Sequence, residues 1–391
     1  NKVATALMDL AWFYTGWAGA MELEKGTKCM DEALEIIMET GDAAGEVQWL
    51  MTSGQMKSAG LGKLDDGEAD LQRALDACRQ FGDKRGMLLG LLNLSLLLNW
   101  KGDLELVRQQ ANESTELLEE LGYQHLRAPL VGILLSNIGE YDEAFKLTQE
   151  NVKIVAEIGV RRYIAMAPNC FGYIYNQLCN FETGIEHDRN GVIVSQRYNE
   201  PECEIFSLLN LAGNYIGLRE YDKAMEYLDG VKQKRELERY GERRWRYDMH
   251  MTRYLSEVWL GRGDCDKAMG FAEQTLTPAQ NTGSKKYIGF GWQLKGQALM
   301  AVDRYEEAIE CLEKARELAD KMGYPPLRWK TRYLLGQVHK AQGRIGQAKE
   351  ELQNAAAVIE KMASKVSDKE VKETFLSSEP VRDVYTELRA L

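Results

Sequence analysis

The stretch that decides the fold is YEEAIECLEKARELADKM, residues 305–322. Its apolar and small side chains lie at offsets 0, 3, 4, 7, 10, 13, 14 and 17: Tyr305, Ala308, Ile309, Leu312, Ala315, Leu318, Ala319 and Met322. These offsets place them on one face of an α-helix. The opposite face is charged, and Gly323 follows as a typical helix stop, with Pro325 suited to start the next helix. The segment is therefore predicted to be one amphipathic helix.

The small residue at Ala308 recurs along the chain at a nearly constant interval. The recurring positions are Gly26, Gly67, Val107, Ala144, Gly184, Ala224, Ala268, Ala308 and Ala348. A period of about forty residues predicts stacked helical hairpins rather than one globular core, with helices of roughly 16–18 residues. Residues that tolerate left-handed geometry mark the expected ends of the second helices, at Gly41, Gly82, Gly122, Gly159, Asn199, Gly241, Gly283 and Gly323.

The first helix of each hairpin carries a second signature. Trp292 and Gly296 precede Ala308 within the repeat, and the glycine returns as Gly336 before Ala348. Small residues at Gly296 and Ala308 would let two helices cross closely. The combination resembles the tetratricopeptide repeat, in which W-x2-L-G-x2-Y precedes a small residue of the second helix. Lys295, where that pattern has Leu, is a local departure.

This resemblance implies an all-α, right-handed superhelical solenoid of about nine hairpins over residues 1–363, with capping helices over 364–391. The period is similar to that of the long-helix variant found in sensor domains of bacterial signalling ATPases, transcription regulators and cyclase-ATPase proteins. A HEAT or armadillo array has a similar period and is the alternative. It does not require a small residue followed by an apolar residue four positions on and another small residue seven positions on, as at Ala308, Leu312 and Ala315.

The C-terminal segment departs from the repeat. Ser367 and Glu370 have the spacing of a helix capping box, and Pro380 separates two amphipathic stretches. We expect a pair of helices that covers the last repeat, since solenoids need such caps for solubility. A docking role for these helices is the alternative.

Composition favours a helical protein that binds neither membranes nor nucleic acid. The 391 residues include only 7 prolines and carry a net charge of −11. No apolar run in the sequence reaches membrane-spanning length. The seven cysteines include no CxxC pair, which indicates free thiols in a reducing compartment, so we expect a cytoplasmic protein. Because the chain begins at Asn1 rather than Met, we also expect it to be a segment of a longer protein with further domains upstream; N-terminal processing is the alternative.

Patterns typical of catalysis or metal binding are weak. The four histidines fall in different repeats, and none pairs with another His or a Cys at metal-ligand spacing: His125, His187, His250 and His339. The segment Gly60–Lys63 is similar to part of a phosphate loop but lacks the full GxxxxGK[ST] spacing. We therefore expect no enzyme activity, no metal and no cofactor.

A binding surface is expected on the first helices, which line the concave side of such a superhelix. Their non-packing positions are rich in amides, which can bond to the backbone of an extended peptide, and include two tyrosines for apolar contact. These positions are Asn169, Tyr173, Asn176, Gln177, Asn210, Asn214, Arg253, Glu257, Gln293, Gln297, Tyr333, Gln337 and Lys340. The alternative is a solvated face with hydrogen bonds between repeats.

The longest interval between two recurring small residues runs from Ala224 to Ala268 and contains an arginine-rich segment. Its last part is a basic patch formed by Arg243, Arg244, Trp245 and Arg246. Such a patch suits an acidic partner or a phosphate. Alternatively, these arginines pair with glutamates of the same segment.

Together these features predict a non-enzymatic module that binds a protein segment or peptide in its concave groove. The resemblance to the long-helix repeats implies that it is the sensor region of a larger cytosolic signalling protein. A small-molecule sensor and a self-assembling scaffold are the alternatives.

Overall fold

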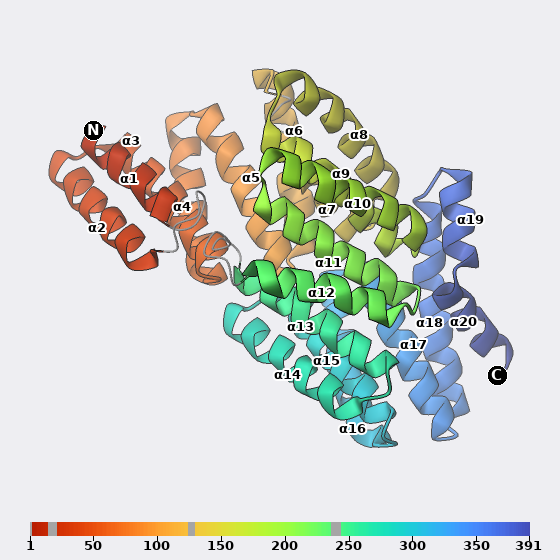
Figure 1. Cartoon of the computed structure of the whole chain (residues 1–391). Coiled ribbons are helices and arrows are strands. Elements are labelled where there is room, and N and C mark those ends of the chain that lie inside the picture. Colours follow the sequence, from red (N-terminus) through yellow and green to blue (C-terminus); the bar gives the residue numbers. More distant parts are fainter. Residues whose placement is uncertain (1, 15–21, 124–129, 236–243) are drawn as a thin grey trace. The chain divides into compact units, whose positions relative to one another are not determined.

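The computed structural model describes residues 2–14, 22–123, 130–235 and 244–391. Over these residues the chain forms α-helices and one π-helix, with no strand (Figure 1). The bounds are α1 (Lys2–Tyr14), α2 (Leu23–Thr40), α3 (Ala43–Gln55), η1 (Met56–Gly60), α4 (Leu64–Phe81), α5 (Lys84–Lys101), α6 (Leu104–Leu121), α7 (Leu130–Asn137), α8 (Tyr141–Ile158), α9 (Arg161–Gln177), α10 (Phe181–Tyr198), α11 (Pro201–Gly217), α12 (Tyr221–Arg235), α13 (Arg244–Gly261), α14 (Cys265–Thr282), α15 (Lys285–Met300), α16 (Tyr305–Met322), α17 (Pro325–Ala341), α18 (Ile345–Ser364), α19 (Lys369–Ser377) and α20 (Glu379–Arg389).

Helices α1 to α18 follow one another as nine consecutive pairs, which confirms the prediction of a helical solenoid. Second helices such as α8, α10 and α16 are each 18 residues long. They end on the predicted residues, whose positive φ angles close the last helical turn: Gly41, Gly82, Gly122, Gly159, Asn199, Gly283 and Gly323. The remaining predicted stop, Gly241, lies outside the described residues.

The two helices of a hairpin cross where their small residues meet. A Cβ atom added to Gly296 would lie 2.6 Å from Leu312 Cγ and 3.2 Å from the carbonyl oxygen of Ala308. In the next hairpin, a Cβ atom added to Gly336 of α17 would lie 2.7 Å from Leu352 Cγ of α18. Larger residues at these glycines would therefore push the helices apart.

The second hairpin contains one extra residue. Gly54 makes the contacts of Gly296, because its added Cβ would lie 2.6 Å from Leu71 Cγ and 3.0 Å from the Gly67 carbonyl oxygen. However, Gly54 and Gly67 stand one position further apart in the sequence than Gly296 and Ala308 do. The π-helix η1 follows soon after Gly54, and its wider turn takes up the additional residue.

Contacts within the chain define two units. Unit 1 comprises Asn1–Leu126 and Lys232–Asp248, and unit 2 comprises Arg127–Val231 and Met249–Leu391. In unit 1, the Trp245 indole N–H donates to the carbonyl oxygen of Ala59 in η1, at 3.0 Å. The same indole packs edge-on against Trp100, with 6.1 Å between ring centroids.

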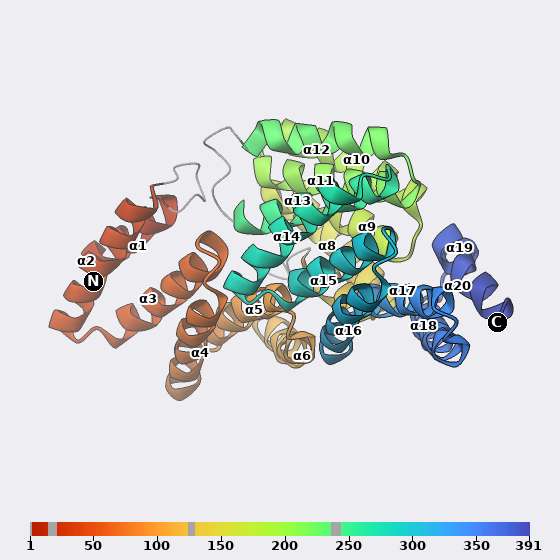
Figure 2. The ribbon, with the colours of Figure 1, turned by 90° about the horizontal axis from the view of Figure 1, so that it is seen from below.

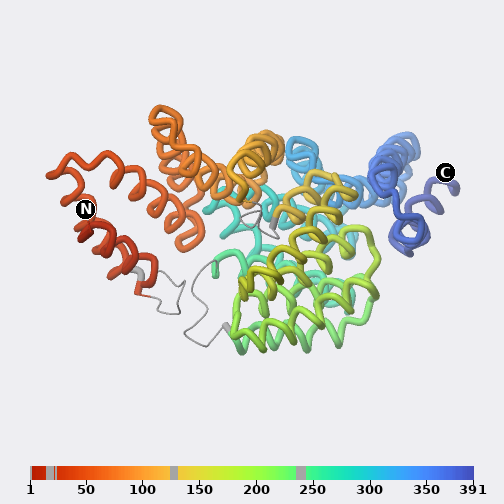
Figure 3. The backbone as a smooth tube through the Cα atoms, turned by 90° about the horizontal axis from the view of Figure 1, so that it is seen from above, coloured from red at the N-terminus to blue at the C-terminus, as the bar shows by residue number. Residues whose placement is uncertain are grey.

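Unit 2 contains hairpins that follow one another from α7 and α8 to α17 and α18 (Figures 2 and 3). The segment after α18 returns to the start of α8. There the backbone N–H of Asp142 donates to the carbonyl oxygen of Lys365 at 3.1 Å. The Asp142 carboxylate accepts from the backbone N–H of Ser367 at 2.8 Å, and Lys365 pairs with Glu140 at 3.0 Å. Residues 225 positions apart are thus joined directly.

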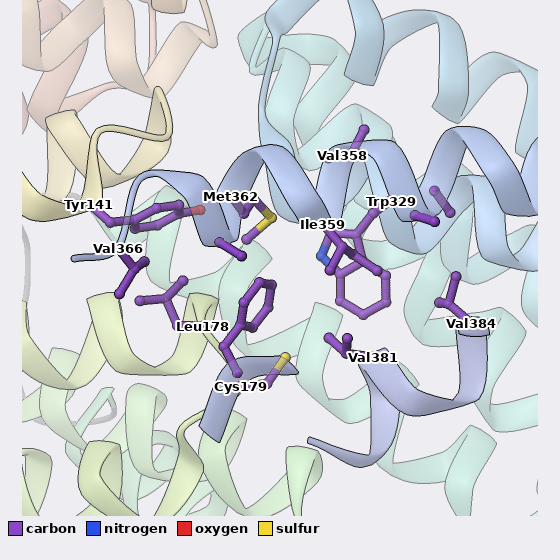
Figure 4. Close-up of a cluster of buried hydrophobic side chains, with 14 of the residues drawn as sticks. Tyr141, Leu178, Cys179, Trp329, Val358, Ile359, Met362, Val366, Val381 and Val384 are labelled. Carbon is purple, nitrogen blue, oxygen red and sulfur yellow. The ribbon is translucent and has the colours of Figure 1, made fainter. Parts of the chain in front are cut away.

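The helices α19 and α20 cover more than the last hairpin. A buried cluster includes Leu178 from the turn between α9 and α10 and Trp329 from α17 (Figure 4). Ile359 from α18 and the C-terminal residues Val381 and Val384 from α20 complete the contact. The C-terminal helices therefore pack on hairpins that are distant in sequence.

The predicted capping box at Ser367 is wrong by one residue. Asp368 is the residue before α19, and its carboxylate accepts from the backbone N–H of Val371 at 3.0 Å. The Ser367 hydroxyl instead donates to Asp142 at 2.5 Å. The contact with the α8 hairpin, which sequence spacing cannot show, takes Ser367 away from the helix end.

Candidate functional site

Several predicted amides lie on the first helices of unit 2 and bond to one another between repeats. The Asn176 side-chain N–H donates to Asn214 Oδ1 at 3.0 Å, linking α9 to α11. Gln177 donates to Asn137 Oδ1 at 3.0 Å, and Gln293 donates to the Thr331 hydroxyl at 2.9 Å. These bonds form an inter-repeat amide network. A ligand-binding role for its members remains a prediction.

The centre of this network is Asp188 of α10, which is fully buried. Its carboxylate accepts from the side-chain N–H groups of Asn210 and Asn214, each at 3.0 Å. Asn210 also donates to the backbone carbonyl of Asn169 at 2.9 Å, while the side-chain N–H group of Asn169 has no partner among the described residues. Burial raises the pKa of Asp188 well above its ordinary value, although the two amide bonds oppose this shift.

Asp188 is not among the residues predicted from the sequence, although its position in the repeat is unusual. It stands four residues after the small residue Gly184, where other second helices have Leu312 or Leu352. The facing glycine, Gly172, leaves room for the carboxylate as Gly296 does for Leu312. An acid in the leucine position of the repeat therefore indicates a buried polar centre.

Asp188 should make the free energy of unfolding decrease as pH rises above about 4, the ordinary aspartate pKa. Above that pH, and up to the raised pKa, the folded chain holds a proton that the unfolded chain has lost. Raising the pH then favours unfolding. Each tenfold difference in proton affinity contributes about 1.4 kcal/mol.

Urea denaturation of the wild type and Asp188→Asn between pH 4 and 8 measures this contribution. The variant should show a flatter pH dependence. The control Glu182→Gln changes an exposed carboxylate on the same helix and should leave the slope unchanged. Equal slopes for wild type and Asp188→Asn would contradict the prediction.

A second group on the inner helices, here called the cation–aromatic centre, combines two cations with aromatic rings. The Arg253 guanidinium of α13 lies 3.6 Å from the centroid of the Phe290 ring of α15. Its Nε–H donates to Glu257 Oε1 at 2.8 Å. Burial opposes the charge of Arg253, but Glu257 and nearby tyrosines hold its pKa above the ordinary value, so the guanidinium stays protonated.

The second cation is Lys286 of α15. Its ammonium lies 4.3 Å from the centroid of Tyr324, the residue before α17, and donates to the Tyr173 hydroxyl of α9 at 2.6 Å. The rings of Tyr324 and Phe290 pack edge-on, with 6.1 Å between their centroids. Arg253 lies on the Phe290 ring and Lys286 on the Tyr324 ring, so the two cations share one pair of packed rings. Side chains that are distant in sequence thus meet around Tyr173.

The remaining predicted residues lie on α15 and α17. Gln297 is half-buried, and Gln337 donates to the Tyr333 hydroxyl at 2.8 Å. Lys340 forms an ion pair with Glu387 of α20 at 2.5 Å. These side chains are nearer to solvent than the buried amides Asn169, Gln177, Asn210 and Asn214.

The arginine-rich patch belongs to unit 1. Arg243 lies outside the described residues, and Arg244 is exposed. The Trp245 indole N–H donates to the Ala59 carbonyl oxygen, and the Arg246 guanidinium lies 6.0 Å from the Trp100 ring centroid. Binding of an acidic partner or phosphate by this patch remains a prediction.

All seven thiols are free of disulfide bonds, and five of them are buried. Among the described residues, no group of three or more His, Cys, Asp or Glu side chains is arranged to hold a metal ion. No described helix is both long and apolar enough to cross a membrane.

Comparisons with known proteins agree with this architecture. A tetratricopeptide repeat family model matches residues 291–321. The crystal structure of a Rap protein complexed with Competence and Sporulation Factor is similar, with a TM-score of 0.56 and 13% identity over 88% of this chain and 99% of that chain. A Signal Transduction ATPase with Numerous Domains from Pyrococcus horikoshii, which has a tetratricopeptide repeat sensor, matches with a TM-score of 0.42 and 12% identity over 89% of this chain and 54% of that chain.

Comparison with curated protein sequences finds no significant match. At the identities found for the solved structures, the similarity concerns the fold alone. Together with the nine helical pairs and the matched repeat, it shows that the fold is a solenoid of tetratricopeptide-like helical hairpins.

Proposed function

We propose that this protein binds a peptide or an extended protein segment on the inner face of unit 2, as the sensor region of a larger cytoplasmic signalling protein. The tetratricopeptide fold supports a protein–protein interaction or scaffold role. The observation that carries the proposal is the cation–aromatic centre, in which α9, α13, α15 and the start of α17 bring Tyr173, Arg253, Lys286 and Tyr324 together.

Partly exposed amides continue this face along neighbouring repeats. Gln297 and Gln337 lie on the first helices α15 and α17 and are half-buried. An amide side chain offers both donors and an acceptor, which matches the alternating N–H and C=O groups of an extended backbone. The Rap protein of similar fold was crystallised with Competence and Sporulation Factor, which supports the proposal by analogy of fold alone.

A selection from a random peptide library tests the proposal. Enriched peptides are synthesised, and their Kd values are measured by calorimetry on the wild type and on Gln297→Ala/Gln337→Ala. Each lost hydrogen bond contributes about 0.5–1.5 kcal/mol, so the double variant should bind at least about fivefold more weakly.

The matched control is Gln274→Ala/Gln347→Ala, which removes exposed amides from the second helices α14 and α18. It should bind like the wild type, and thermal unfolding checks that both double variants are folded. The proposal fails if no peptide is enriched over a parallel selection on heat-denatured protein. It also fails if both double variants weaken binding equally.

A further inference from the structure

The C-terminal helix α20 carries two separate stripes of side chains. Acidic residues recur at every fourth position, and apolar residues follow the i, i+3, i+7 spacing of another helical face. The acidic stripe consists of Glu379, Asp383 and Glu387, and the apolar stripe consists of Val381, Val384 and Leu388. The helix can therefore attach to its surroundings through ion pairs on one side and apolar packing on another.

The acidic stripe joins α20 to two hairpins that are distant in sequence. Arg219, in the turn between α11 and α12, pairs with Glu379 at 3.0 Å and with Asp383 at 3.8 Å. Further along the helix, Glu387 pairs with Lys340 of α17 at 2.5 Å. Because these pairs lie at opposite ends of the stripe, α20 spans from the α11–α12 hairpin to the α17–α18 hairpin.

The helix α20 lies against α17 residues that belong to the predicted binding surface. Tyr333, Gln337 and Lys340 share one face of α17, at the spacing i, i+4, i+7. Burial, together with the acidic side chains Asp383 and Glu387 of α20, raises the pKa of Tyr333 to about 12. Gln337 donates to the Tyr333 hydroxyl. The α17 end of this face is thus covered by a segment of the same chain.

The attachment of α20 is light. Of its described residues only Val381 and Val384 are buried, in the cluster of Figure 4. The side chains of Arg219 and Glu379 are 62% and 50% exposed, so water and salt weaken their ion pair. Ser378 separates α20 from α19 with non-helical backbone, at φ −59° and ψ 146°, and provides a hinge. A short helix held in this way can open locally while the repeats stay folded.

We infer that α20 is a displaceable strap, which covers the α17 end of the ligand-binding face and leaves it when a ligand binds. This inference rests on the proposed function, because it assigns a regulatory element to the same face. A ligand that needs the uncovered face binds with an apparent Kd raised by the reciprocal of the uncovered fraction. Loosening the strap therefore tightens binding, and binding in turn releases the strap.

Cys179 reports the opening of α20 without any ligand. It lies in the turn after α9, is 3% exposed, and contacts Ser378 in the same buried cluster as Val381. Cys170 of α9 is also buried but belongs to a different cluster, so it reports the opening of the repeats themselves. Labelling with N-ethylmaleimide, followed by mass spectrometry of the peptides, gives a rate for each thiol.

The strap variant is Asp383→Lys/Glu387→Lys, which places like charges beside the cations that these acids pair with. We expect Cys179 to be labelled at least about tenfold faster than in the wild type, because two favourable pairs become repulsive. The labelling rate of Cys170 should stay unchanged. Raising the salt concentration on the wild type should also speed the labelling of Cys179 alone, and this measurement needs no substitution.

The matched control is Glu370→Lys/Glu373→Lys, which reverses two exposed acids of α19. It should leave both labelling rates at their wild-type values. The inference is overturned if neither the strap variant nor salt accelerates Cys179 selectively. It is also overturned if the control variant accelerates Cys179 as much as the strap variant does.

Library selections on the wild type and on the strap variant separate this inference from the proposed function. Each enriched peptide should bind the strap variant at least about threefold more tightly, and saturating peptide should speed the labelling of Cys179 in the wild type. Equal affinities for both proteins would overturn the inference while the proposed function stands. If no peptide is enriched on either protein, the proposed function fails, and the labelling rates alone decide whether α20 opens as a strap.

Discussion

Replacing Trp329 with alanine should lower the free energy of unfolding of unit 2 by about 3–5 kcal/mol. Trp329 is only 1% exposed, and its ring packs between α18 and α20, beside Ile359, Val381 and Val384 (Figure 4). Truncation leaves a large cavity at the point where the last hairpin meets the C-terminal helices. Chemical denaturation followed by circular dichroism measures the loss.

Two further substitutions sharpen this prediction. Trp292→Ala removes a tryptophan of the same unit that is only partly buried and lies under Lys314, so we expect a smaller loss of roughly 1–2 kcal/mol. Trp329→Phe should cost less than Trp329→Ala, because it keeps most of the ring and removes an indole N–H that has no hydrogen-bond partner among the described residues. Equal losses for the two alanine variants would show that Trp329 is not a central contact.

Gly172→Ala is expected to destabilise unit 2 by about 3 kcal/mol, through overpacking and disturbed buried hydrogen bonds. The added Cβ would lie 2.2 Å from Asp188 Oδ2 and 2.3 Å from Asp188 Cγ and Oδ1. The carboxylate cannot turn away without breaking its bonds to Asn210 and Asn214. Thermal and chemical unfolding of the variant measure the effect.

Gly270→Ala provides a control of opposite sign. Gly270 lies within α14, and a Cβ atom there would meet nothing within 4 Å. Alanine in an open helix position should stabilise the protein by about 0.5–1 kcal/mol. Destabilisation of similar size in both variants would mean that the loss at Gly172 reflects the helix backbone rather than Asp188.

The features that could be predicted from the sequence depend on local spacing. The crossing of Gly296 with Leu312 and the left-handed stop at Gly323 need only residues within one hairpin. The wider spacing between Gly54 and Gly67 is also local. The sequence alone, however, does not show that a π-helix takes up the additional residue.

The cation–aromatic centre could be predicted only in part. Tyr173 and Arg253 were expected on the inner helices, whereas Lys286 and Tyr324 were not. Their meeting with Tyr173 depends on the rotation between successive repeats, accumulated over several hairpins. The repeat period fixes the length of each hairpin and leaves this accumulated rotation undetermined.

The bonds that join Glu140 and Asp142 to Lys365 and Ser367 also affect how unit 2 folds. In an open solenoid each repeat contacts only its neighbours, so terminal repeats can unravel independently. Here the terminal hairpins of the unit hold each other through bonds between residues 225 positions apart. Such a contact forms only after a large loss of chain entropy, which slows folding relative to helical proteins with local contacts. Once formed, it makes the first and last hairpins of unit 2 open together, as a single cooperative element.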